Sequence, residues 1–216
     1  VFPWVPGRHI ERSEVSPSIA AAVGAGLAGL HRAGDQVAEL PDRFGIYTTR
    51  KIVERARGFR DSSDPAVVEV NATLTEEARW LMAQPEPADL GIIHGDLFRD
   101  NVLFAPDGQE LVALLDFEQA SLGSRVYDLA VCINAWCFDQ AFDSAQVAAM
   151  VGAYGAVDER ALWVELRRSA WRFTVTRITD VYLPGIDLPD KDFRRYARRL
   201  QAWRELGGDG LGNWLS

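Results

Sequence analysis

One run of thirteen residues, Ile92 to Phe104, constrains this chain more than any other. It reads as an apolar stretch, a polar loop with the letters His94-Gly95-Asp96-Leu97-Phe98-Arg99-Asp100-Asn101, and a second apolar stretch. Pro106-Asp107-Gly108 follows and is a strong turn sequence. The pattern therefore predicts a β-hairpin formed by residues 102–104 and 111–115.

Such a hairpin brings Asn101, before its first strand, close to Asp116, which follows its second strand. Asp96 would reach the same place from the loop. Oxygen-bearing side chains suit a hard cation such as Mg²⁺, and one carboxylate remains for proton chemistry. A lone His-Gly-Asp would be an ordinary turn sequence, but three features in a strand-loop-strand context favour a catalytic interpretation.

The loop His94-Gly95-Asp96-x-x-x-x-Asn101 and the segment Asp116-Phe117-Glu118 resemble two motifs of the protein-kinase-like fold. Their wording is similar to that of small-molecule kinases of the aminoglycoside phosphotransferase and choline kinase type. The resemblance implies an α+β chain, mostly α-helical, that corresponds to the C-terminal large lobe of this fold with a small catalytic β-hairpin.

The same resemblance implies roles for five residues. Asp96 would be the catalytic base that faces the substrate hydroxyl. Asn101 and Asp116 would hold Mg²⁺ on the phosphates of ATP, the co-substrate. His94 and Asp128 would support the loop, with Asp128 reaching it from the next helix.

Longer strings resemble bacterial homoserine kinases, and they cover nearly the whole chain. They are residues 94–102, Tyr127-Asp128-Leu129-Ala130, Asn134-Ala135-Trp136-Cys137-Phe138, Arg172-Phe173-x-x-x-Arg177-x-x-Asp180 and Lys191-Asp192-Phe193. The implied reaction converts ATP and L-homoserine to O-phospho-L-homoserine, a step of threonine biosynthesis. Glu118 departs from the aromatic residue that many homoserine kinases carry there. The alternatives are a kinase of the same fold acting on an aminoglycoside, choline or methylthioribose, and a non-catalytic large-lobe binding module.

Homoserine is a zwitterion, so its site needs a cation or amide for the carboxylate and a carboxylate or aromatic face for the ammonium. The candidates for the carboxylate are Arg172, Arg177 and Asn134, and those for the ammonium are Asp180, Glu118 and Trp136. Each also has a structural interpretation. Arg177 and Asp180 are spaced for an internal ion pair, and Asn134 lies in a very apolar segment where its amide needs partners of some kind.

The first seven residues, Val1-Phe2-Pro3-Trp4-Val5-Pro6-Gly7, resemble the hinge of these kinases, where Phe2 and Val5 would contact the adenine. A glycine-rich phosphate loop and a strand lysine, which the small lobe contributes in the family, do not precede them. We therefore expect residues 8–206 to form a large lobe whose partner is a missing N-terminal small lobe. The glycine-rich segment 207–216 is expected to be a flexible tail.

Gly24-Ala25-Gly26-Leu27-Ala28-Gly29 matches the dinucleotide-binding pattern G-x-G-x-x-G. That pattern requires a preceding strand, whereas Ser16-Pro17 begins a helix here. The glycines are therefore interpreted as close-packing positions on a helix. Further helices are expected at 49–57, from 65 to a point before Pro85, and at 126–138, 144–154, 158–181 and 192–206, with a loop at 119–123.

A net charge of −8 argues against a nucleic-acid partner. The sequence contains neither an apolar run of the roughly 20 residues that span a bilayer nor a signal peptide. Cys132 and Cys137 lie in an apolar segment with a spacing unsuited to a redox or zinc pair, so two buried free thiols are expected. These features favour a cytoplasmic protein with no membrane partner.

Overall fold

The computed structural model describes residues 4–37 and 45–216, so the predicted hinge residue Phe2 lies outside the described residues. The described chain is mostly helical, as predicted, and contains two small antiparallel strand pairs, one of which is the predicted hairpin. The helices are α1 (Pro17–Gly34), α2 (Thr49–Arg57), α3 (Pro65–Met82), α4 (Arg125–Trp136), α5 (Ser144–Tyr154), α6 (Glu159–Arg177) and α7 (Arg194–Leu215). The strands are β1 (Leu90–Ile93), β2 (Val102–Phe104), β3 (Leu111–Leu114) and β4 (Ser121–Ser124).

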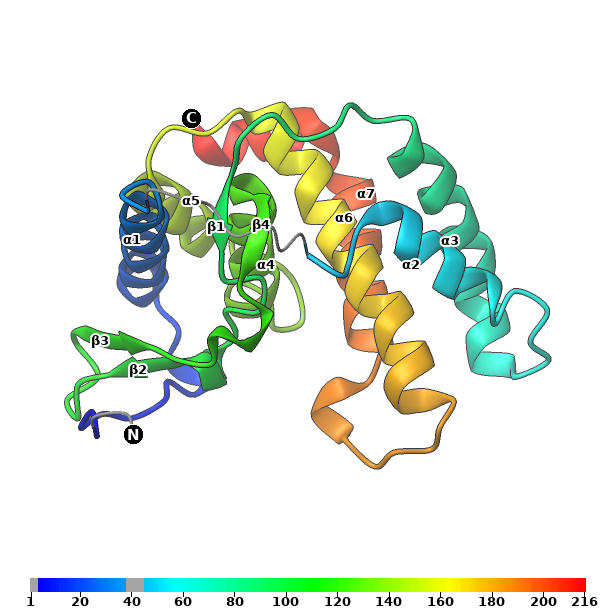
Figure 1. Ribbon diagram of the computed structural model, residues 1–216, viewed down its shortest axis with the longest axis horizontal. Helices are drawn as coiled ribbons and strands as arrows, with labels where there is room; N and C mark the ends of the chain where they lie inside the picture. Colours follow the sequence, from blue (N-terminus) through cyan, green and yellow to red (C-terminus); the bar gives the residue numbers. More distant parts are fainter. Residues whose placement is uncertain (1–3, 38–44) are drawn as a thin grey trace.

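The helices form two groups on either side of α4 (Figure 1). On one side α1 packs against α5, and on the other α6 packs against α4, α7 and α2, with α3 outermost. The centre is α4, ten of whose twelve residues are buried. A helix that is apolar almost all round is buried in this way.

Two helix starts show how local sequence sets the elements. The Ser16 side chain accepts a hydrogen bond from the backbone N–H of Ile19, and Asp64 accepts from Ala66 and Val67. Each capping residue precedes a proline at the first helical position, where the missing N–H costs nothing. The sequence predicts both starts, and both predictions are confirmed.

Close packing of α1 against α5 explains Gly24, the first glycine of the run. A Cβ atom added to Gly24 would lie 2.2 Å from the carbonyl oxygen of Met150, so only glycine lets the two backbones approach this closely. Gly24 is inside a continuous helix, and residues 4–16, the described segment before this helix, contain no strand. The interpretation as a close-packing position is thus confirmed for Gly24.

The predicted catalytic hairpin is formed by β2 and β3, which pair antiparallel with Val102 opposite Leu114. A second pair, β1 with β4, differs from the prediction, because residues 119–123 were expected to be a loop. Ser121–Ser124 lacks the β-branched residues typical of strands. It pairs with the apolar β1, and Gly123 leaves room for the side chain of Ile93.

The predicted flexible tail is also wrong. After a kink at Gly207, where φ is 72°, the helix α7 continues to Leu215. Leu211 is fully buried and Trp214 packs on the core, with its ring centroid 6.0 Å from that of Trp203. Burial of these two apolar side chains offsets the backbone entropy of the glycines.

The remaining sequence expectations concern the thiols and the membrane. Cys132 and Cys137 are both buried and free, as predicted. Within residues 4–37 and 45–216, none of the helices combines the length and the apolar character needed to cross a bilayer.

Candidate active site

The polar loop after β1 is anchored to the first turn of α4 by Asp128. This fully buried carboxylate accepts hydrogen bonds from the backbone N–H groups of His94, at 2.7 Å, and Gly95, at 2.8 Å. Nε2 of His31, on α1, lies 3.0 Å from the same carboxylate. Three elements thus converge on one buried anion whose lone pairs are well occupied.

His94 joins this loop to the end of the hairpin. Its Nε2 lies 2.7 Å from the carbonyl oxygen of Leu115, and its ring centroid is 4.9 Å from that of Phe117. The residue between them in sequence is Asp116. The buried histidine therefore fixes the distance between the loop that carries Asp96 and the segment that carries Asp116.

Asp116 has an unusual backbone conformation. Its φ of 57° and ψ of 68° are left-handed, and among the described residues other than glycine it alone has a positive φ. Such strain of about 1–3 kcal/mol persists only where the surroundings impose it, and it is concentrated at functional sites. The side chain is exposed, and its Oδ1 accepts a hydrogen bond from the backbone N–H of Glu118 at 3.3 Å.

Asn101 is held between the loop and the hairpin. The side-chain Nδ2 of Asn101 donates to the backbone carbonyl of Asp96 at 2.8 Å. The backbone carbonyl of Asn101 accepts from the N–H of Leu115, also at 2.8 Å. The amide nitrogen is thereby committed, so Oδ1 is the atom of this side chain that can ligate a cation. Hydrogen bonds thus link Asn101 directly to Asp96 and to Leu115, the residue that precedes Asp116.

The donor chemistry of Asn101 and Asp116 fits Mg²⁺. In the described part of the chain, no group of three or more His, Cys, Asp or Glu side chains is arranged to hold a metal. A site made of one carboxylate and one amide oxygen is consistent with this, because protein-bound Mg²⁺ usually has only one or two carboxylates and completes its shell with phosphates and water.

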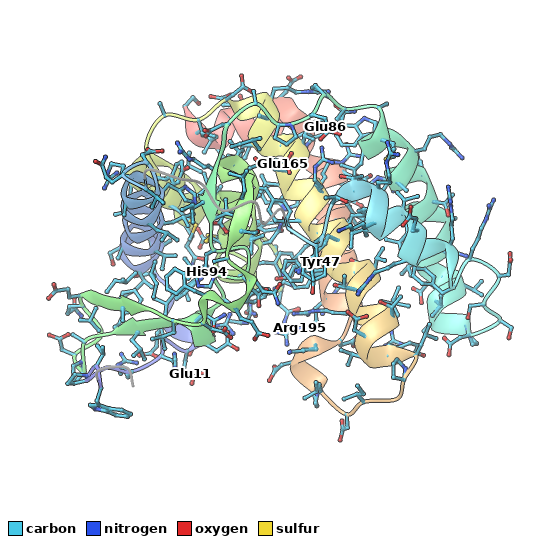
Figure 2. The ribbon with its side chains drawn as sticks, viewed as in Figure 1. Glu11, Tyr47, Glu86, His94, Glu165 and Arg195 are labelled. Carbon is cyan, nitrogen blue, oxygen red and sulfur yellow. The ribbon has the colours of Figure 1, made fainter. Side chains whose placement is uncertain are left out.

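Asp96 opens into a cavity of about 540 Å³ between the loop, α6 and the start of α7. The residues that line it are Glu11, Arg12, Tyr47, Asp96, Phe98, Arg99, Asp100, Gln119, Ala135, Arg172, Phe173, Thr176, Arg177, Asp180, Val181, Asp190, Lys191, Arg195, Tyr196 and Arg199. Figure 2 labels three of them, Glu11, Tyr47 and Arg195. Burial raises the pKa of Asp96 above its usual value, an effect that the nearby charges of Arg172 and His94 oppose. A raised pKa is typical of a carboxylate that acts as a base.

The cavity is rich in guanidinium groups. Burial lowers the pKa of Arg12, Arg99, Arg177 and Arg199, and repulsion from neighbouring arginines adds to the effect. For Arg199 the pKa falls to about 10. These side chains remain cationic at neutral pH, so the cavity is suited to an anionic group.

Of the substrate-binding candidates from the sequence, Arg172, Arg177 and Asp180 line this cavity. The predicted internal ion pair of Arg177 with Asp180 is wrong. Asp180 pairs instead with Arg55 of α2 at 2.8 Å. Arg177 lies over the ring of Tyr196, 4.4 Å from its centroid.

Asn134 and Trp136 are core residues, which corrects their assignment as substrate contacts. The fully buried Asn134 donates to Leu166 O and Ser169 Oγ and accepts from Trp203 Nε1 at 2.9 Å. Trp136 donates from Nε1 to the carbonyl oxygen of Leu97 at 3.1 Å. Glu118, the remaining candidate, is exposed and is not among the described residues that line the cavity.

Sequence reasoning missed the other cationic and aromatic residues of the cavity. These residues come from segments that are far apart in the chain, and they are Arg12, Tyr47, Arg99, Lys191, Arg195, Tyr196 and Arg199. The basic character of residues 191–199 was the available signal. Val5, the described hinge candidate, is half-buried, and Arg8 nearby pairs with Phe104 of the hairpin.

A helical lobe with a hydrogen-bonded loop, a hairpin and a cationic cavity defines a phosphotransferase-like large lobe. Residues 1–167 match the model of the phosphotransferase enzyme family, and the chain belongs to this family. Its similar curated proteins include two homoserine kinases. That of Nitrobacter winogradskyi is 37% identical over 207 residues, covering 89% of this chain and 62% of the relative. That of Beijerinckia indica is 39% identical over 199 residues, covering 87% and 60%.

The chain therefore spans about 60% of the length of these curated relatives. Solved structures of the same fold include a choline/ethanolamine kinase family protein from Mesorhizobium loti, with a TM-score of 0.66 at 19% identity, covering 98% of this chain and 70% of that one. A choline kinase from Streptococcus pneumoniae has a TM-score of 0.65 at 15% identity, covering 92% and 67%. At such identities the likeness establishes the fold alone.

Proposed function

We propose that the protein containing this chain phosphorylates the hydroxyl group of L-homoserine with ATP, giving O-phospho-L-homoserine and ADP. The observation that carries the proposal is the position of Asp96, a desolvated carboxylate, in a cavity whose other charges are mainly cationic. The moderate identity to proteins named homoserine kinase supports the same substrate.

The charge of the cavity favours an amino acid over choline and aminoglycosides, two of the alternative acceptors. Six arginines and one lysine line it, against five carboxylates. Choline carries a fixed positive charge and aminoglycosides carry several, so both would be repelled by this lining. A zwitterion with a carboxylate can pair with the guanidinium groups while its hydroxyl approaches Asp96.

In the proposed reaction, Asp96 accepts a hydrogen bond from the acceptor hydroxyl and holds its oxygen in line with the terminal phosphate of ATP. The oxygen forms the new bond to phosphorus, the bond to the ADP oxygen breaks, and Asp96 receives the hydroxyl proton. Asn101 and Asp116 would hold Mg²⁺ at the hairpin. The metal, when bound, neutralises charge on the phosphates.

A coupled assay of ADP release on the natural protein tests the proposal. L-Homoserine, choline, an aminoglycoside and methylthioribose are compared at equal concentrations, and the phosphorylated product is identified by ³¹P NMR. We expect the highest kcat/KM with L-homoserine. A clear preference for any of the other three acceptors would contradict the proposed substrate, and no turnover with any of them would contradict the enzyme assignment.

A further inference from the structure

Arg172 is a buried cation in the wall of the cavity that also contains Asp96. Its side chain lines the cavity although only 4% of the residue is exposed. Within residues 4–37 and 45–216 it forms no ion pair, and its Nε has no hydrogen-bond partner. A ligand that accepts a hydrogen bond would compensate this buried guanidinium.

Aromatic packing fixes the orientation of this guanidinium. Its central carbon lies 3.7 Å from the ring centroid of Tyr47 and 3.9 Å from that of Phe173. Tyr47 is labelled in Figure 2, beside α6. Since a guanidinium presents its N–H groups as a rigid planar fork, the packing pre-orients that fork before any ligand arrives.

Tyr196 supplies a second donor in the wall of the same cavity. The residue is 2% exposed, and its hydroxyl has no hydrogen-bond partner in the described part of the chain. Its ring packs against the guanidinium groups of Arg177, at 4.4 Å, and Arg199, at 4.5 Å. Burial raises the pKa of this phenol, so it is a neutral O–H donor at physiological pH.

We propose that Arg172 and Tyr196 together form the subsite that binds the carboxylate of the amino-acid acceptor, an inference that rests on the proposed function. Two buried donors without partners line one cavity with Asp96, and a carboxylate can accept from both. The acceptor hydroxyl would then lie at Asp96. Of the charged groups around Asp96, Arg172 lowers its pKa the most. Tyr196 would thus select amino-acid alcohols over simple amino alcohols.

The test compares L-homoserine with 3-amino-1-propanol, which is homoserine without its carboxylate. The measured quantity is the ratio of kcat/KM for the two acceptors, in the natural protein and its variants. Tyr196→Phe should lower this ratio by about tenfold or more, chiefly through the KM for L-homoserine, because a hydrogen bond to a charged group is lost. Arg172→Lys should lower it too, because lysine keeps the charge but loses the fork.

Tyr182→Phe is the matched control. The Tyr182 hydroxyl donates to Asp64 at 3.1 Å, and the residue does not line the described cavity. Its variant should keep the wild-type ratio. A ratio unchanged in both Tyr196→Phe and Arg172→Lys would overturn the subsite while leaving the proposed function intact.

Calorimetric titration with L-homoserine separates the two proposals. If the wild type binds L-homoserine without phosphorylating it, the proposed function fails. Binding that Tyr196→Phe weakens and Tyr182→Phe preserves would still support the subsite. Binding that both variants preserve, or no binding by the wild type, would overturn the subsite.

Discussion

The backbone N–H of His94 lies 2.7 Å from the carboxylate of Asp128, which is 34 residues further along the chain and fully buried. This contact makes the position of the loop depend on the first turn of α4. A substitution of Asp128 would therefore disturb both the buried core and the loop that carries Asp96, the proposed catalytic base.

Asp128→Asn should therefore affect both stability and activity. In asparagine an NH2 group replaces one of the two carboxylate oxygens that accept hydrogen bonds from backbone N–H groups. One donor would then face another donor in a buried site. We expect a loss of about 3 kcal/mol in the free energy of unfolding, measured by urea denaturation, with a parallel fall in kcat. The exposed Asp187→Asn is the control. Equal stability of the two variants would refute the anchoring role.

Asp96→Asn should abolish most turnover and yet stabilise the protein. A carboxyl group whose pKa is raised by folding binds more protons in the folded state, so its contribution to stability falls as pH rises above the ordinary value of 3.8. The variant removes this destabilisation. We expect a higher melting temperature than that of the wild type at neutral pH, and this gain should shrink towards pH 3.8. The kcat should fall by about a hundredfold or more. A lower melting temperature at neutral pH would contradict the desolvation argument.

In the wild type, the kcat/KM of the proposed reaction should decline on the acid side as Asp96 is protonated. Because burial raises the pKa of this carboxyl, the decline should be centred above 3.8, the ordinary value. The pH profile of ADP release measures it. Assays are paired with circular dichroism at each pH, so that acid unfolding is not mistaken for titration. A midpoint at or below 3.8 would show that the group responsible is not the desolvated Asp96.

Asp116→Asn removes the carboxylate of Asp116 and keeps its backbone conformation. Asparagine tolerates the left-handed conformation observed here, so the fold should be retained. We expect kcat to fall by at least about a hundredfold and the Mg²⁺ concentration for half-maximal activity to rise. Asp107→Asn, in the exposed hairpin turn, serves as the comparison. An unchanged Mg²⁺ requirement in Asp116→Asn would remove Asp116 from the metal site.

Gly24→Ala and Gly29→Ala, both in α1, should change stability in opposite directions. The new methyl group at position 24 would meet the carbonyl oxygen of Met150, whereas at position 29 the nearest atom is 3.9 Å away on Arg32. We expect Gly24→Ala to cost about 1–3 kcal/mol and Gly29→Ala to gain about 0.5–1 kcal/mol. Thermal and urea unfolding measure both. Similar effects for the two variants would argue against backbone contact between α1 and α5.

Sequence reasoning succeeded where the signal is local. Caps such as Ser16-Pro17 and Asp64-Pro65 set helix starts through atoms within three residues, and the hairpin follows from its turn. Reasoning failed for β4, because Ser121–Ser124 becomes a strand through its partner β1 rather than through its own residues.

The site shows the same division. Asp96, Asn101 and Asp116 are close in sequence and linked through one hairpin. Asn134 was assigned to the substrate because a polar residue in an apolar helix can face either a ligand or a distant partner. Its partner Trp203 is 69 residues away, a distance over which no pattern in the sequence identifies a contact. The other arginines of the cavity were missed for this reason also; they are Arg12, Arg99, Arg195 and Arg199.

The outer edge of the hairpin is paired with the start of the described chain (Figure 1). Arg8 and Phe104 exchange two backbone hydrogen bonds, of 2.8 and 2.9 Å, and His9 Nδ1 lies 3.0 Å from Val102 O. Residues 8 and 9 thus contact β2, the strand that immediately follows Asn101. A displacement of residues 8 and 9 would therefore shift β2 and, with it, the position of Asn101, one of the two proposed metal-binding residues.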